Sequence, residues 1–242
     1  MKKLNLILLL LVLGFRLSAQ STTAAAYQFA TAANYNLANM SGATPVIGSN
    51  QENVSTITFD LGFTFTFAGT AYNNFSVNSS GVIGLGTTAV SPFYYEPNNQ
   101  ILNQFYKYPM IIPWSDALTT ATDGGVSYKV VTVNNQKRLI IEWRVKASTD
   151  DETTSYNKTF QAWLYEGSNA IRYVYGNSNT RDENSYTGIA KSYTDYKLIN
   201  TSNHTVGQFS NFAWPGAGRT YVLSPDVFVD TPNPLDLGND GS

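Results

Sequence analysis

The chain of 242 residues has no cysteine, one histidine, and charged side chains at only 13% of its positions. Without cysteine, disulfide bonds, thiol nucleophiles and thiolate metal ligands are all excluded, so burial and sheet hydrogen bonds must hold an exported form together. The single histidine, His204, lies in the polar stretch 202–205. A Ser-His-Asp triad would have to use it, but no nucleophile-elbow motif is present, so we expect a solvated loop histidine.

The first 19 residues have the three parts of a secretory signal peptide. Two lysines precede the apolar run Leu4–Leu13, and Ala19 supplies a small residue before Gln20. The apolar run is shorter than the roughly 20 residues that a membrane-spanning helix needs. The sequence therefore predicts a signal peptide over residues 1–19, a secreted or cell-surface location, and a mature chain without a transmembrane segment.

The mature chain is expected to be mildly acidic. The signal peptide holds three basic residues and no acidic one, so its removal changes the net charge from −2 to −5. This balance argues against nucleic acid or an anionic membrane as the main partner. Residues 20–224 suffice for one large domain. Residues 225–242 contain few large apolar groups and predict a flexible acidic tail or linker.

One stretch shows strict alternation of apolar residues with small or polar ones. The apolar positions are Ile57, Phe59, Leu61, Phe63, Phe65 and Phe67. Successive side chains of a strand point to opposite faces, so this period of two places six large apolar groups on one face. The pattern is typical of a half-buried antiparallel strand, and we expect it to be the central strand of the core, with its rings between two sheets.

The rest of the chain also predicts strands. Two hairpins are expected where polar turns separate strand-like runs, at Asn134–Gln136 and Gly167–Asn169. Further strands are expected near residues 26–30, 75–77, 82–85, 110–114, 186–190, 196–199 and 220–223. Helical spacing occurs in Asn99–Tyr106. The sequence therefore predicts an all-β antiparallel β-sandwich with one short helix.

The stretch from Ile57 to Gly176 resembles a known family. The residues that carry the resemblance are, in order, Leu61-Gly62-Phe63-x-Phe65-x-Phe67-x-Gly69, Phe75-x-Val77, Ser79-Ser80-Gly81-x-Ile83-x-Leu85-Gly86, residues 110–116, Gly124-Gly125-Val126-x-Tyr128 and the Glu-Trp centre of 139–145. This series is similar to the nidogen-like module of animal matrix and cell-surface proteins and of exported bacterial proteins. Ser80 stands where that family usually has Asn, and Trp114 follows Pro113 without the residue that usually separates them. The resemblance implies an extracellular β-sandwich that serves adhesion.

Aromatic residues gather in the middle of the chain, at Phe93, Tyr94, Tyr95 and Trp114. Rings that lie flat on a surface bind sugars or peptides, and the same rings can instead cap the core of a sandwich. Both interpretations are open from the sequence. In the first of them, these four residues are the predicted binding residues.

Asp116 and Asp123 are candidate metal ligands. Asp116 follows the apolar run 110–114, and Asp123 lies a short loop away. Two carboxylates on adjacent loops could hold Ca²⁺, although about six to eight oxygen ligands are usual and no EF-hand spacing is present. Alternatively, Asp116 accepts hydrogen bonds from the backbone amides of its turn.

Paired carboxylates for glycoside hydrolysis could come from Asp60, Asp116, Glu142 and Glu166, if two of them lie roughly 5 to 10 Å apart in a cleft. The alternative for Glu142 and Arg144 is an exposed position on a strand. We expect a non-catalytic module for adhesion or recognition of an extracellular protein or glycan, without a cofactor. A carbohydrate-binding or glycoside-active jelly-roll domain and a self-associating subunit of an extracellular assembly are the alternatives.

Overall fold

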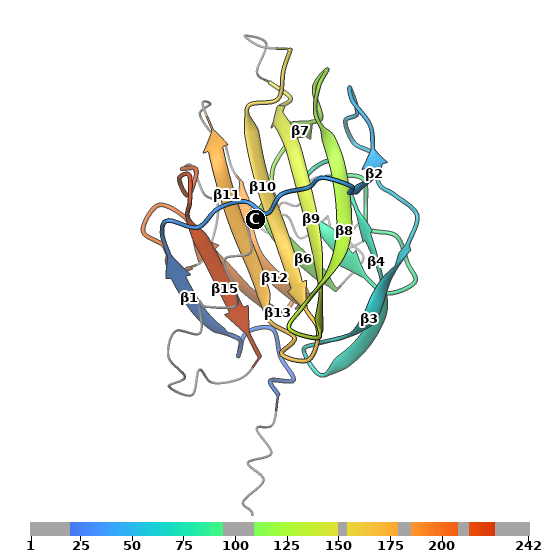
Figure 1. Cartoon of the computed structure of the whole chain (residues 1–242). Helices are drawn as coiled ribbons and strands as arrows, with labels where there is room; N and C mark the ends of the chain where they lie inside the picture. Colours follow the sequence, from blue (N-terminus) through green and yellow to red (C-terminus); the bar gives the residue numbers. More distant parts are fainter. Residues whose placement is uncertain (1–19, 94–108, 150–153, 179–184, 208–212, 226–242) are drawn as a thin grey trace, which may run out of the picture.

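The computed structural model describes residues 20–93, 109–149, 154–178, 185–207 and 213–225. These residues form two antiparallel sheets that pack face to face, with no helix in these ranges (Figure 1). The predicted all-β antiparallel β-sandwich is therefore confirmed. The predicted helix at 99–106, the signal peptide at 1–19 and the tail beyond residue 225 lie outside the described residues.

Among the described residues, the first sheet has eight strands and the second has seven. The order in the first is β1 (Gln28–Ala32), β15 (Thr220–Ser224), β11 (Ile171–Ser178), β10 (Lys158–Tyr165), β9 (Gln136–Ala147), β8 (Gly125–Val133) and β2 (Thr44–Ile47), and β7 (Leu118–Thr119) pairs with β9. The order in the second is β14 (Thr205–Gly207), β13 (Asp195–Asn200), β12 (Tyr186–Ser192), β6 (Met110–Ser115), β5 (Ile83–Leu85), β4 (Thr70–Val77) and β3 (Phe59–Phe67).

Strand β3 confirms most of the predicted alternation. Its residues Leu61, Phe63, Phe65 and Phe67 are buried in the core. The expectation for Ile57 is wrong, because this residue precedes the strand and its side chain is 75% exposed. The expectation of a central strand is also wrong, since β3 lies at the edge of its sheet. Alternation reports which face is buried, whereas the position in the sheet depends on pairing partners elsewhere in the chain.

Two tight turns set the register of the hairpins. Ala68 and Gly69, between β3 and β4, both have positive φ, at 47° and 80°. Asn134 and Asn135, between β8 and β9, have φ values of 50° and 62°. Positive φ at both central residues is the requirement of the type I′ turn, whose twist matches that of the flanking strands. The predicted hairpin at 134–136 is confirmed, and β4 begins directly at Thr70.

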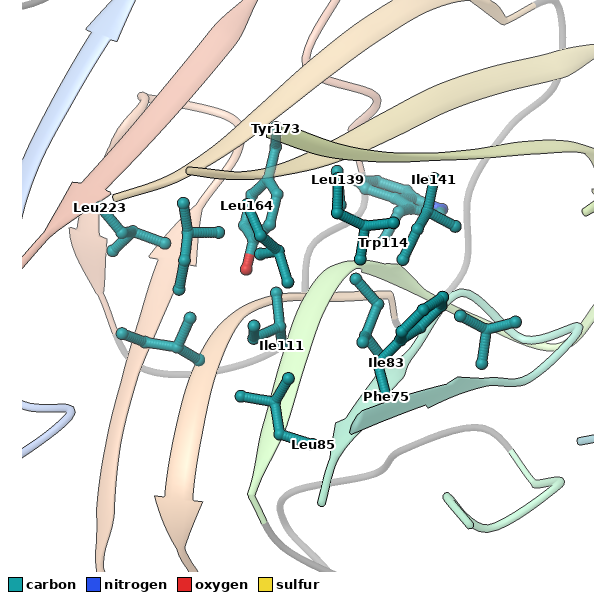
Figure 2. Packing of buried hydrophobic residues seen from close by; sticks show 14 of the residues in the cluster. Phe75, Ile83, Leu85, Ile111, Trp114, Leu139, Ile141, Leu164, Tyr173 and Leu223 are labelled. Atoms are coloured by element: carbon teal, nitrogen blue, oxygen red, sulfur yellow. The ribbon is translucent and has the colours of Figure 1, made fainter. Parts of the chain in front are cut away.

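The core lies between the two sheets (Figure 2). Phe75, Ile83, Leu85 and Ile111 of the seven-stranded sheet face Leu139, Ile141, Leu164, Tyr173 and Leu223 of the eight-stranded sheet. Tyr173 and Tyr175 also link the sheets through hydrogen bonds, because their hydroxyls donate to the carbonyls of Gly188 (2.6 Å) and Pro113 (2.7 Å). Burial raises the pKa of both phenols well above the usual value, so they stay protonated donors.

A segment between β1 and β2, residues 33–43, crosses the outer face of the eight-stranded sheet (Figure 1). We call it the strap. The carboxamide of Gln161 fixes it by accepting from the Ala38 amide and donating to the Ala38 carbonyl, each at 2.9 Å. The aromatic ring of Tyr35 lies 4.4 Å from the buried guanidinium of Arg172. The strap therefore closes a second, smaller hydrophobic layer around Trp163 on the outside of the sandwich.

Candidate functional site

Four loops meet at one end of the sandwich, the top in Figure 1. They are residues 48–56, 78–82 and 116–124, together with the described parts of the loop between β9 and β10. Backbone hydrogen bonds join them to one another, from Asn50 to Ala121 (2.6 Å), Ser79 to Val54 (2.8 Å), Thr122 to Thr154 (2.9 Å) and Ser148 to Ala117 (2.9 Å). We call this end the loop pole. These bonds hold the backbones of the loops in fixed relative positions.

The buried side chain of Asn78 holds Phe93 at the loop pole. Its amide nitrogen donates to the carbonyls of Ser91 (2.9 Å) and Phe93 (3.2 Å), and its amide oxygen accepts from the backbone of Val82 (2.8 Å). The ring of Phe93 is 53% exposed. Of the predicted aromatic binding residues, Phe93 is thus available to a ligand, while Tyr94 and Tyr95 lie outside the described residues.

Trp114 does not form part of an exposed aromatic surface. Its side chain is fully buried and lies edge-on to Trp214, with ring centroids 4.9 Å apart. The prediction of Trp114 as a binding residue is corrected, and the core interpretation applies to it. The turn at Gly81 packs directly on this strand, since a Cβ at Gly81 would lie 1.9 Å from the Trp114 carbonyl oxygen. Trp114 therefore supports the Gly81 turn of the loop pole from the core side.

Asp116 and Asp123 both lie at the loop pole, where each accepts a hydrogen bond from a backbone amide. The carboxylate of Asp116 accepts from Ala117 (2.8 Å), and that of Asp123 accepts from Tyr156 (2.8 Å). These contacts fit the interpretation that the carboxylates stabilise turns. No group of three or more histidine, aspartate and glutamate side chains suited to a metal ion occurs in the part of the chain that the structure describes. The Ca²⁺ site therefore stays a prediction.

A hollow of about 290 Å³ opens beside the loop pole, on the outer side of the eight-stranded sheet. It is lined by Ala43, Pro45, Ile47, Gly48, Gly124, Gly125, Val126, Ser127 and Arg144. The guanidinium of Arg144 lies 4.5 Å from the ring centroid of Tyr156 and donates to the Asp123 carbonyl. The sequence suggested only an exposed strand residue here, because the loops that enclose Arg144 are distant in the chain.

Glu142, two residues before Arg144 on β9, is half-buried. Its carboxylate accepts from the Gln161 side chain at 2.7 Å. Burial raises the pKa of Glu142, and the hydrogen bond from Gln161 and the charges of Arg144 and Lys129 only partly offset this rise. A half-buried carboxylate with a raised pKa is a candidate functional group.

Three of the four carboxylates proposed for a glycosidase pair lie apart, namely Glu142, Glu166 and Asp60. Glu142 is paired in register with Gln161 of β10, and Glu166 lies directly after the end of β10, five residues beyond Gln161 and about 17 Å away at strand spacing. Such a pair needs roughly 5 to 10 Å. Asp60 lies on β3, in the other sheet. Its carboxylate accepts a hydrogen bond from the Gly62 amide at 2.7 Å. Glu142 therefore has neither of these two carboxylates as a catalytic partner.

His204 differs from the solvated histidine that the sequence suggested. Its Nδ1 lies 2.7 Å from the hydroxyl of Tyr221, a residue buried in the core. Partial burial and the nearby charge of Arg219 lower the pKa of His204. The histidine thus connects the β13–β14 turn to β15, and no other described histidine exists for acid–base chemistry.

Two antiparallel sheets with braced loops at one pole define a β-sandwich module. The family model described as NIDO related matches residues 26–225, and the chain belongs to that family. The membership confirms the resemblance to the nidogen-like module and suggests an extracellular β-module. No curated protein and no solved structure matches the chain. Within the described ranges, no helix has the length and apolar character to cross a membrane.

Proposed function

We propose that the protein is an exported, non-catalytic recognition module that binds an extracellular ligand at its loop pole and so serves adhesion. The observation that carries this proposal is the hollow of about 290 Å³ beside the pole, with the Arg144 guanidinium fixed in its wall. Binding sites are concave surfaces with a few well-placed polar groups, and they are usually formed before the ligand arrives.

The way the loops are held supports a binding role. Binding residues often lie on loops that a rigid scaffold positions, and at the loop pole four loops are tied together by backbone hydrogen bonds. Preorganised loops lose little conformational entropy when a ligand binds, which favours affinity. The exposed ring of Phe93 adds an aromatic surface that could contact a sugar or peptide.

The state of the carboxylates supports a non-catalytic role. Asp116 and Asp123 accept hydrogen bonds from backbone amides. Glu142 lies about 17 Å from Glu166, which is too far for a shared reaction centre. Export of the module rests on the signal-peptide pattern of residues 1–19 and on the family.

The test is a binding screen of the chain from Gln20 to Ser242 on arrays of glycans and matrix proteins, with hydrolysis measured in parallel. We expect at least one ligand without turnover, and Phe93→Ser should weaken its binding about tenfold. The control is Tyr193→Ser, which removes another partly exposed ring at the opposite end, between β12 and β13. Turnover, the absence of any ligand, or an equal loss in both variants would contradict the proposal.

A further inference from the structure

The hollow beside the loop pole has fixed walls. One wall comes from the end of the strap, from Pro45 and Ile47 of β2 and from the following Gly48, and the other comes from Gly124 and the start of β8. The backbone is packed so closely there that a Cβ at Gly124 would lie 1.9 Å from the Thr120 carbonyl oxygen and 2.1 Å from that of Arg144. The shape of the hollow is therefore set by backbone contacts.

Arg144 brings a cation to this hollow with hydrogen-bonding capacity to spare. One of its terminal nitrogens donates to the Asp123 carbonyl, and the Tyr156 ring supports the plane of the guanidinium. Its Nε is buried and has no hydrogen-bond partner among the described residues. Buried donors are nearly always paired, so the groups of the chain leave this guanidinium incompletely satisfied. Because Arg144 is only half-buried, a ligand in the hollow would meet the terminal nitrogens of the guanidinium and not the shielded Nε.

The chemistry of the lining points to the partner. A guanidinium presents its donors as a planar fork that matches the two oxygens of a carboxylate. The remaining lining offers the Ser127 hydroxyl and the backbone of the glycines beside apolar Pro45 and Ile47. A sugar ring has the same mixture of hydroxyls and apolar C–H faces. The volume lies near the lower end of the range of about 300–1,000 Å³ for ligand pockets, which suits a single ring.

We propose that this hollow binds one sugar acid, a hexuronate ring, whose carboxylate pairs with Arg144 and whose hydroxyls meet Ser127 and the glycine backbone. The inference rests on the proposed function, because it names the ligand class for the same loop pole. The same ring could be a free monosaccharide or one residue of an acidic polysaccharide, and both are tested below.

The experiment is calorimetric titration of the chain from Gln20 to Ser242 with glucuronate, with hexuronate oligosaccharides, and with glucose as the neutral match. We expect glucuronate to bind with a Kd of the order of 1 mM, which is ordinary for one small ring, and glucose to bind at least tenfold more weakly. Tighter binding of the oligosaccharides would identify a polysaccharide residue as the source. Equal binding per ring would identify the free sugar.

Arg144→Gln removes the charge and should weaken glucuronate binding at least tenfold, whereas Lys197→Gln, on β13 of the other sheet, should leave it unchanged. If Arg144→Gln fails to fold, Ser127→Val provides a second test, because it removes the hydroxyl that the sugar would meet, narrows the hollow and suits a strand while the cation stays in place. Glucuronate binding that survives in a folded Arg144→Gln or Ser127→Val variant would overturn the inference.

Three further outcomes decide between this inference and the proposed function. Equal binding of inorganic phosphate or of an acidic dipeptide would overturn the sugar-acid assignment, because the site would then accept any anion. No glucuronate binding, together with an array ligand that depends on Phe93, would overturn the inference and leave the proposed function standing. No ligand in either experiment would overturn both.

Discussion

Glu142, on the outer face of the eight-stranded sheet, makes the stability of the protein depend on pH. Burial raises the pKa of the Glu142 carboxyl above its ordinary value of about 4.5. Because the folded protein holds this proton more tightly than the unfolded chain, the stabilising contribution is complete below about pH 4.5 and is lost as the pH rises through the folded pKa. At neutral pH the ionised carboxylate therefore lowers the free energy of unfolding.

We predict that Glu142→Gln raises the melting temperature at pH 7 by a few degrees, since about 1 kcal/mol corresponds to roughly 2–4 °C in a domain of this size. At pH 4 the variant and the natural chain should melt together. Thermal melts at both pH values test this prediction. Glu52→Gln, at an exposed position, is the control and should show no comparable gain at pH 7. A drop in melting temperature at pH 7 for Glu142→Gln would contradict the assignment.

Gly81 gives a second prediction at the level of one residue. Its φ is +84°, and a Cβ would lie 1.9 Å from the backbone oxygen of Trp114. Gly81→Ala should therefore lower the free energy of unfolding by more than about 3 kcal/mol, through backbone strain and a clash that only backbone movement can relieve. Urea-induced unfolding measures the loss.

Gly42→Ala is the matched control for Gly81→Ala. Gly42 has a similar φ of +74°, but nothing lies within 4 Å of the position of its Cβ. The strain is thus present without the clash, and we expect a loss of only about 1 kcal/mol. Similar losses in the two variants would show that the contact between Gly81 and Trp114 is looser than the structure indicates.

At the level of elements, the region of β3 shows that a residue can fit the alternating pattern without being buried. Phe65 and Ile57 occupy equivalent positions in the alternating sequence, yet Phe65 is fully buried and Ile57 is 75% exposed. We predict that Phe65→Asp unfolds the domain, because an unpaired charge in the core costs several kcal/mol of a total of about 5–15. Ile57→Asp should change stability by less than about 0.5 kcal/mol. Circular dichroism melts of both variants are the measurement, and a folded Phe65→Asp protein would refute the placement of this face.

The elements that the sequence predicted are those specified by local chemistry. The β8–β9 hairpin follows from Asn134 and Asn135, which tolerate positive φ, and the buried face of β3 follows from its alternation. Strand β2 was not predicted, because it is short and contains Pro45, which cannot donate to a ladder. It pairs with β8, about 80 residues further along the chain, and a local pattern carries no information about such a partner.

The candidate site likewise combines residues that the local sequence identified with residues whose role depends on distant parts of the chain. Phe93, Asp116 and Asp123 were identified from sequence because they are aromatic or acidic residues beside predicted strands, and all three lie at the loop pole. Arg144 was missed, because its environment is created by Asp123 and Tyr156 from two other loops. Trp114 was ambiguous, since only the packing of one sheet on the other decides whether its ring is buried.

At the level of the whole molecule, the residues just after the predicted cleavage site belong to the fold. Ala24 and Tyr27 are fully buried, and the Tyr27 hydroxyl accepts from the Ala68 amide at 3.1 Å. The Lys191 ammonium donates to the carbonyls of Thr22 and Ala68, each at 2.9 Å. These contacts involve the β3–β4 turn, at the opposite end from the loop pole. The N-terminal segment therefore closes that end of the sandwich.

This packing is compatible with the predicted cleavage after Ala19 and disfavours a cleavage site further along the segment. Cleavage after Ala19 keeps residues 20–27 intact, whereas cleavage after Tyr27 would remove two core side chains and the contacts that Thr22 makes. We predict that N-terminal sequencing of the exported protein finds Gln20. A chain that starts at Gln28 should lose at least about 3 kcal/mol of stability, which is the usual cost of removing one buried aromatic side chain.

Two point variants test whether the N-terminal segment stabilises the fold through its buried side chains. Tyr27→Ala should lower the melting temperature by several degrees, because it empties a fully buried site. Thr23→Ala, at an exposed position four residues earlier, should leave the melting temperature unchanged. If the exported protein instead began within residues 24–28 and melted at the same temperature as the chain from Gln20, the segment would not be part of the stable fold. Both the cleavage site and the closure of this end would then have to be abandoned.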